Sequence, residues 1–221
     1  SLPILSKLIK SKKINQANQI QNKSLELSLL LSLPASIALI IGSDEVVNAL
    51  FGYGSFTEND VEQTALALKY FGYGIPAFAT LKIFANFFFA RDNTLTPFKI
   101  SSIVVIINVV ISVLFFKQIG FVIIPIATTL STWAGVLCYL YILLKIEYLK
   151  IVPKFYTKLI KIVFSTSIMS YIFHNSLSYF AKNLSYSSDY KILYLLFIVF
   201  FMALLYFLIC YFLKVLNLRS F

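Results

Sequence analysis

Long apolar stretches alternate with short polar ones along the whole sequence. An apolar stretch of about 18 residues or more is long enough, as a helix, to cross a hydrocarbon core about 30 Å thick. We predict six such helices, over residues 24–41, 61–90, 97–116, 121–144, 162–180 and 192–213. Their apolar residues are continuous rather than alternating, which argues against a transmembrane β-barrel. The pattern therefore predicts an all-α integral membrane protein.

The composition supports this class. Hydrophobic residues make up 59% of the 221 residues, charged residues make up 13%, and the mean hydropathy is +0.85, all far outside the soluble globular range. The spans leave no room for a separate soluble domain, so we predict one six-helix transmembrane lobe over residues 24–221. Residues 1–23 mix Leu and Ile with Lys at helical spacing, which predicts a cytoplasmic amphipathic linker. Because the chain lacks an initiator Met, we expect it to be a fragment.

The basic residues predict the orientation in the membrane. Fourteen Lys and Arg residues lie in alternate segments, namely 1–23, 91–99, 145–161 and 214–221, against three in the opposite loops. Basic residues stay on the cytoplasmic side, so both ends of this segment are predicted to be cytoplasmic. This interpretation treats the spans as free of acids and places six acids on the opposite side. The net charge of +10 then reflects topology and contact with anionic membrane lipids, with no nucleic-acid partner.

Several spans carry residues that interrupt helices. Pro34 lies in the first span, Gly72, Gly74 and Pro76 in the second, and Pro125 in the fourth. Each proline frees a backbone carbonyl that needs another partner, which suits a moving transporter, although prolines and glycines are also common in ordinary membrane helices. Ahead of the second span, Thr57 and Asp60 have the spacing of a capping box.

Residues for catalysis or metal binding are scarce. Cys138 and Cys210 are isolated in separate spans, and His174 is the single histidine. We therefore predict no catalytic residues, no metal site and no enzyme activity.

The turn between the second and third spans, FFFARDNTLTPFKIS (87–101), is the first candidate site. Pro97 suits the first turn of a helix, and Thr94 or Thr96 is placed to cap it. This turn is either a plain hairpin or part of a gate that uses Arg91 and Asp92. Lys82 lies about 13 Å up the same helix, where it either extends to the inner interface or meets an anion.

A second candidate site lies on the third and fourth spans. Asn108, with Ser112 one turn later, and Thr128 and Thr129 on the next span form a predicted cluster of uncharged oxygens. Such uncharged oxygens form hydrogen bonds between helices in most cases, and a weak cation site is the other interpretation.

Four sequence blocks strongly resemble the MurJ/MviN family of lipid II flippases. They are LPILS (2–6), SLELSLLLSLPASIALI (24–40), LFGYGSFTENDV (50–61) and the FFFARDNTLTPFKIS turn. Their order and spacing match the second half of that family. The resemblance implies the last six of fourteen transmembrane helices in a bacterial inner-membrane transporter of the MOP superfamily, with the preceding linker. It also implies a first lobe of the same protein that this chain lacks.

The resemblance further implies a function. Members of this family move the undecaprenyl-linked peptidoglycan precursor, lipid II, from the inner to the outer leaflet by alternating access, for cell-wall biogenesis and cell shape. The last two helices would form a groove for the prenyl tail. We hypothesise that the turn helps to close the cytoplasmic gate, with Arg91 and Asp92 engaging the other lobe or the pyrophosphate and Lys82 offering the phosphate a second cation. Coupling to sodium or to the membrane potential is implied, with a sodium ion near Asn108 and Thr128. Ser112 stands where a carboxylate is expected, which would weaken that site.

Two other classes remain open. Another MOP-superfamily transporter, such as an O-antigen lipid flippase or a multidrug exporter, would share the helix count. A membrane-embedded prenyl-lipid enzyme ranks last, because Asp92 and Glu147 are the acids available to it near the interface.

Overall fold

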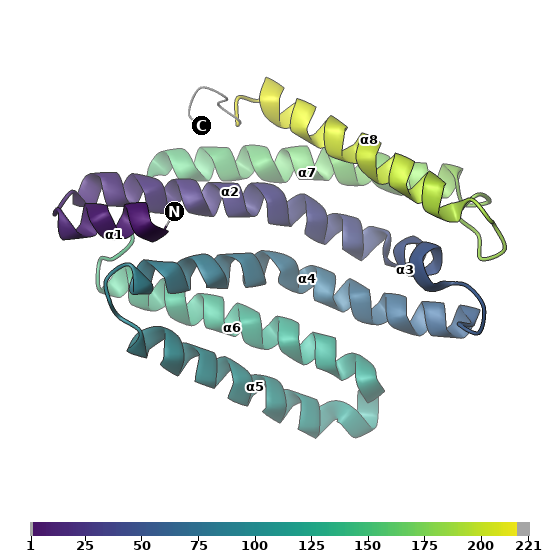
Figure 1. Ribbon diagram of the computed structural model, residues 1–221, viewed down its shortest axis with the longest axis horizontal. Helices are drawn as coiled ribbons and strands as arrows, with labels where there is room; N and C mark the ends of the chain where they lie inside the picture. The colour runs from purple at the N-terminus through teal and green to yellow at the C-terminus, as the bar shows by residue number, and fades with distance from the viewer. Residues whose placement is uncertain (1, 216–221) are drawn as a thin grey trace. The chain divides into compact units, whose positions relative to one another are not determined.

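The computed structural model describes residues 2–215, and these residues form helices joined by short connections (Figure 1). The elements in chain order are α1 (Leu2–Lys10), α2 (Ile14–Ile41), α3 (Ser43–Phe51), α4 (Glu58–Phe89), α5 (Leu95–Ile119), the 3₁₀ helix η1 (Gly120–Val122), α6 (Ile123–Lys145), α7 (Pro153–Tyr179) and α8 (Lys191–Phe212). The all-α class predicted from the sequence is confirmed.

The six predicted spans correspond to α2 and to α4 through α8. Helices α2 and α7 begin about ten residues before the predicted spans, because their first turns are polar and hydropathy does not register them. Three stretches of the described residues are long and apolar enough to cross a membrane, namely Ile14–Ile41, Leu95–Lys145 and Lys191–Phe212. The second of these contains both α5 and α6. Helices α4 and α7 carry more charged residues and are not among them.

The chain forms two compact units. Unit 1 contains the residues up to Ser32 and Gly74–Leu159, and unit 2 contains Leu33–Tyr73 and the residues from Ile160 onward. The divisions in α2 and α4 fall beside Pro34 and between Gly72 and Gly74, where the sequence predicts interruptions. Both helices nevertheless continue through these residues.

The backbone group freed by Pro76 has a partner. Pro76 has no N–H to donate to the carbonyl of Gly72, four residues earlier. The buried Ser36 hydroxyl of α2 donates to that carbonyl instead, at 2.7 Å. A Cβ on Gly72 would lie 3.1 Å from Ile40 Cγ1, so the glycine also allows α2 and α4 to approach closely. The expectation that the freed carbonyl finds a protein partner is confirmed here.

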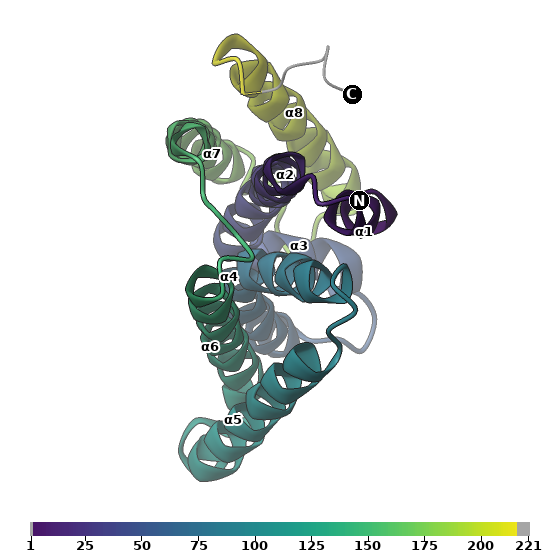
Figure 2. The same ribbon diagram turned by 90° about the vertical axis from the view of Figure 1, so that its left-hand side faces the viewer.

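The core of unit 1 is aromatic. Phe84 and Phe88 of α4 contact Tyr139 of α6, with ring centroids 6.4 and 5.6 Å apart. Helix α5 packs along α6, as both views show (Figures 1 and 2), and Gly135 lets them approach because a Cβ there would lie 2.6 Å from Val104 Cγ2. The amphipathic helix α1 joins this core through Leu5, which is buried.

Unit 2 contains the predicted capping box. The Thr57 N–H and hydroxyl donate to Asp60 Oδ2 at 2.8 and 2.7 Å, and Asp60 N–H donates back to Thr57 Oγ1 at 3.3 Å. The capping prediction is confirmed, with Asp in place of the usual Glu or Gln. The hydrogen bonds from Thr57, first from its side chain and then from its backbone, lower the pKa of Asp60.

Candidate functional site

The turn between α4 and α5 is stabilised by its asparagine. Asn93 Oδ1 accepts the Thr96 N–H at 3.1 Å, and Asn93 Nδ2 donates to Thr96 Oγ1, also at 3.1 Å. Thr94 occupies the N-cap position of α5, as predicted, but its side chain makes no cap hydrogen bond. Asn93 accepts the Thr96 N–H instead. Pro97 lies in the first turn of α5, as predicted.

Arg91 binds one main-chain oxygen of α4 and one of the loop between α6 and α7. Its Nη1 donates to the Phe87 carbonyl at 2.7 Å, and its Nη2 donates to the Tyr148 carbonyl at 2.9 Å. The guanidinium also stacks 4.2 Å from the centroid of the Tyr148 ring. Burial lowers the pKa of Arg91, but a guanidinium remains charged at physiological pH. Arg91 thus ties the end of α4 to the loop between α6 and α7.

Asp92 has a different environment. Its backbone is left-handed, with φ of 57°, a conformation that Asp tolerates better than most residues. Its carboxylate lies 3.5 Å from Lys10 Nζ of α1, and the two side chains are 77% and 66% exposed. An ion pair this exposed contributes about 1 kcal/mol or less. Asp92 therefore shapes the turn more than it anchors α1.

Lys82 lies apart from this turn. It is exposed on α4, and none of the hydrogen bonds and ion pairs found among the described residues includes it. Nine residues separate it from Arg91, which is about two and a half helical turns, so the two residues lie on opposite sides of the α4 axis. Within unit 1, Lys82 and Arg91 do not form one cation pair.

In the second candidate cluster, a hydrogen bond joins Asn108 and Thr128. Asn108 Nδ2 of α5 donates to Thr128 Oγ1 of α6 at 2.9 Å, and Thr128 Oγ1 donates to the Ile124 carbonyl at 2.7 Å. One turn after Asn108, the buried Ser112 Oγ has no hydrogen-bond partner among the described residues. These are neutral oxygens without a carboxylate, a donor set that suits only weak binding of a small cation.

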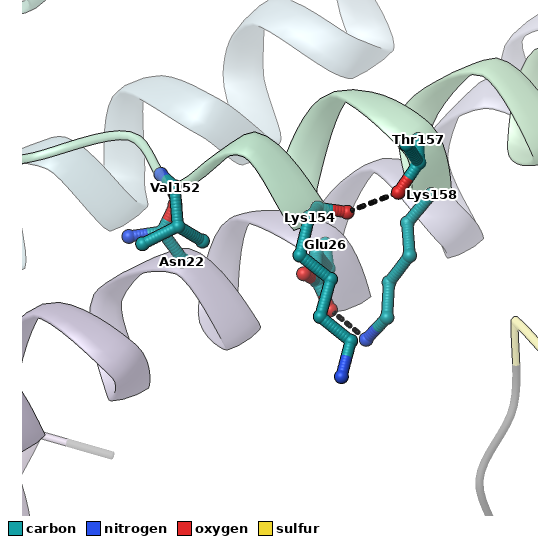
Figure 3. A network of polar contacts seen from close by, with 6 residues as sticks. All are labelled: Asn22, Glu26, Val152, Lys154, Thr157 and Lys158. Carbon is teal, nitrogen blue, oxygen red and sulfur yellow. Dashed lines mark hydrogen bonds and ion pairs between the residues drawn. The ribbon is translucent and has the colours of Figure 1, made fainter.

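An ion pair between α2 and α7 was missed by the sequence reasoning. Lys158 Nζ lies within hydrogen-bonding distance of Glu26 Oε2, and the two side chains are only 26% and 13% exposed (Figure 3). The interpretation of the spans as free of acids is wrong, since Glu26 lies inside the predicted span 24–41 and Glu62 inside 61–90. An acid within an apolar span needs a partner, and that requirement could have identified the pair.

Two asparagines extend this polar connection along α2. Asn22 lies one turn before Glu26, and its Oδ1 accepts the Val152 N–H at 3.1 Å (Figure 3). Its Nδ2 donates to the Lys150 carbonyl at 2.8 Å, while Asn18 Oδ1 accepts the Lys150 N–H at 3.2 Å. The α6–α7 loop is therefore fixed to α2 on one side and to Arg91 on the other.

Comparisons with known proteins give a consistent result. Residues 1–195 match the family model described as "Lipid II flippase MurJ". A probable lipid II flippase MurJ of Rickettsia prowazekii (strain Madrid E) is 38% identical over 132 residues, which are 60% of this chain and 26% of that protein. The corresponding protein of Rhizobium tropici is 36% identical over 132 residues, 60% of this chain and 25% of that protein. The chain thus spans about a quarter of the length of these relatives.

A solved structure, "Lipid II flippase MurJ, inward closed conformation", has a similar fold. It superposes with a TM-score of 0.75 and 22% identity, over 96% of this chain and 42% of that one. At this level of identity the likeness is one of fold.

Proposed function

The chain belongs to the MurJ family of lipid II flippases, and on that premise we propose that it forms part of a transporter of undecaprenyl-linked peptidoglycan precursor. The precursor would move from the inner to the outer leaflet by alternating access, for cell-wall synthesis. The observation that carries this proposal is the family match over residues 1–195. The family is one of transporters, so the residues of the site are assigned binding and gating roles rather than catalytic ones. No observation favours another MOP transporter or a prenyl-lipid enzyme.

We propose that α2 and α4 through α8 are the six spans of a C-terminal lobe, residues 24–221, in a fourteen-helix protein. Residues 1–23 would be the linker on the cytoplasmic membrane surface. The likeness to the solved flippase, which covers 96% of this chain but 42% of that one, supports a partner lobe elsewhere in the full protein. The segment 214–221 contributes Lys214 and Arg219 to the excess of basic residues on the cytoplasmic side. Of this segment, residues 216–221 lie outside the described residues.

The proposed orientation places both ends of the segment in the cytoplasm of a bacterial cell. Single cysteines at Asn59, in the first turn of α4, and at Asn93, in the α4–α5 turn, test it. In intact cells, we expect a membrane-impermeant thiol reagent to label the cysteine at 59, and to label the cysteine at 93 only after permeabilisation. The basic bias is the reason, since moving Lys and Arg across the membrane is costly. Labelling in the reverse order would refute the orientation.

We propose that the Arg91 turn acts at the cytoplasmic gate, with Arg91 and Asp92 facing the other lobe or the precursor's pyrophosphate. Two of the five guanidinium N–H groups are used by the Phe87 and Tyr148 carbonyls, which leaves others for an anion. Lys82, exposed on the other side of α4, would offer a second and separate cation. The last two helices would hold the prenyl tail, since α8 is almost wholly apolar.

For coupling, we propose that the membrane potential contributes more than a sodium gradient. Asn108, Ser112 and Thr128 would hold a sodium ion through neutral oxygens, without the charge of a carboxylate to strengthen the attraction. The Ser112 hydroxyl, which has no hydrogen-bond partner among the described residues, would be free to turn toward a cation.

Genetic complementation tests the function. The full-length protein that contains this chain is expected to restore growth of cells depleted of their own lipid II flippase, whereas residues 1–221 alone are not, because one lobe cannot alternate access. The control is equal membrane abundance of both proteins, measured by immunoblotting. Failure of the full-length protein at normal abundance would refute the proposed substrate, and rescue by this segment alone would refute the two-lobe arrangement.

A further inference from the structure

Lys191, the first residue of α8, is fully buried. Its ammonium donates to three oxygens, the Gly52 carbonyl at 2.7 Å, the Tyr186 carbonyl at 2.9 Å and Asn48 Oδ1 at 3.2 Å. A lysine has three N–H groups, so each one has an acceptor. The acceptors come from α3, from the glycine that follows it and from the loop before α8.

Two aromatic rings complete the surroundings of this ammonium. Its Nζ lies 4.1 Å from the centroid of the Tyr53 ring and 4.9 Å from that of Tyr186. None of the ion pairs among the described residues includes Lys191. The charge is therefore stabilised by three oxygens and two ring faces without a direct ion pair, and the nearby Asp189 carboxylate also favours the charged form. These contacts depend on the placement of both loops.

Two further hydrogen bonds join α3 and the loop after it to the segment before α8. Asn48 Nδ2 donates to the Leu184 carbonyl, and Tyr186 Oη donates to the Phe56 carbonyl, each at 2.7 Å. Gly52 leaves the room that this arrangement needs, since a Cβ there would lie 2.4 Å from Asn48 Oδ1 and 3.2 Å from Lys191 Nζ. The glycine loop, residues 52–57, and the segment 184–191 are thus held together although some 130 residues separate them.

We propose that Lys191 is a latch that locks the glycine loop to the start of α8, so that α3, both loops and α8 move as one rigid block. An apolar side chain at position 191 would avoid the cost of burying a charge, but it would leave three buried oxygens without a donor. The lysine therefore selects one arrangement of the two loops. This inference concerns unit 2 alone and stands whether or not the proposed transport function is correct.

Hydrogen exchange on the full-length protein in detergent tests the latch. Backbone amides on both sides can report, because Tyr53 donates to the Phe51 carbonyl, Phe56 to the Tyr53 carbonyl and Ser188 to the Ser185 carbonyl. Lys191→Met keeps the length of the side chain and removes the donors. We expect exchange in residues 52–57 and 184–191 to accelerate together by about tenfold or more, since hydrogen bonds to a charged group are lost. Lys182→Met, an exposed lysine of the same loop, is the matched control and should leave exchange unchanged.

Chemical rescue makes the test specific for the ammonium. In Lys191→Ala, propylammonium chloride is expected to restore protection of both segments, whereas sodium chloride at the same concentration is not. Tyr53→Leu, which removes one ring face, should accelerate both segments by a smaller factor. The latch would be overturned if exchange in Lys191→Met were unchanged or accelerated in one segment only. Equal acceleration throughout α4 would also overturn it, because that result would indicate general destabilisation.

Discussion

Glu26→Ala is expected to lower the free energy of unfolding of the full-length protein by about 3 kcal/mol, the lower end of the range for breaking a buried ion pair. The change leaves the Lys158 ammonium without its carboxylate at a site where the two side chains are 26% and 13% exposed. Little water reaches the orphaned charge, so solvation cannot replace the lost partner. The same reasoning predicts a similar loss for Lys158→Met.

Unfolding in mixed detergent measures this loss, and the chain provides a matched control. Glu147 and Lys150 form an ion pair at 3.0 Å whose side chains are 73% and 63% exposed, so Glu147→Ala should cost about 1 kcal/mol or less. Replacing both Glu26 and Lys158 by leucine should recover most of the stability, because no charge then remains buried. If Glu26→Ala cost no more than Glu147→Ala, the pair would be only a surface contact.

The apolar pattern predicts the helices well because a chain in hydrocarbon must satisfy its backbone groups internally. Each predicted span therefore coincides with a helix, and the proline and glycine positions mark where α2 and α4 pass between the two units. The capping box is equally predictable, since Thr57 and Asp60 are three residues apart. Such features depend on residues that are close in sequence, so the periodicity and spacing of residue types predict them directly.

Contacts between distant segments are less predictable. Both acceptors of Arg91 and two of the three acceptors of Lys191 are main-chain carbonyls. Every residue has such a carbonyl, so the residue types in the sequence do not predict these contacts. The basic pattern places Lys191 in a loop on the side opposite the cytoplasm, whereas the structure buries it in the first turn of α8. Glu26 differs, because its partner could have been predicted. An acid within an apolar span needs a partner, and Lys158 lies in a segment that is predicted to be on the same, cytoplasmic side.

Arg91→Ala is expected to reduce flipping of the lipid-linked precursor by about tenfold or more in vesicles that contain the full-length protein. The guanidinium makes two charge-assisted hydrogen bonds to carbonyls, and each is worth about 1.5–3 kcal/mol. Loss of these bonds would release the α4–α5 turn from the α6–α7 loop and would also remove a cation from the proposed gate. Arg91→Lys should recover only part of the rate, since an ammonium lacks the planar fork of donors and stacks less well on Tyr148.

Two comparisons separate the gate from a merely anchored turn. Asp92→Asn keeps a residue that tolerates the left-handed backbone, and within unit 1 it removes only the exposed ion pair with Lys10. A loss of flipping as large as that of Arg91→Ala would therefore indicate that Asp92 engages the other lobe, whereas a small loss would leave Arg91 alone at the gate. Lys82→Ala should also lower flipping, and because Lys82 and Arg91 lie on opposite sides of α4, the two losses should multiply in the double variant. A double variant no slower than Arg91→Ala alone would mean that both cations serve one step at one site. Wild-type flipping rates in both single variants, at equal protein abundance, would contradict the gate. Arg91 would then only connect the turn to the α6–α7 loop, and Lys82 would only extend to the membrane interface.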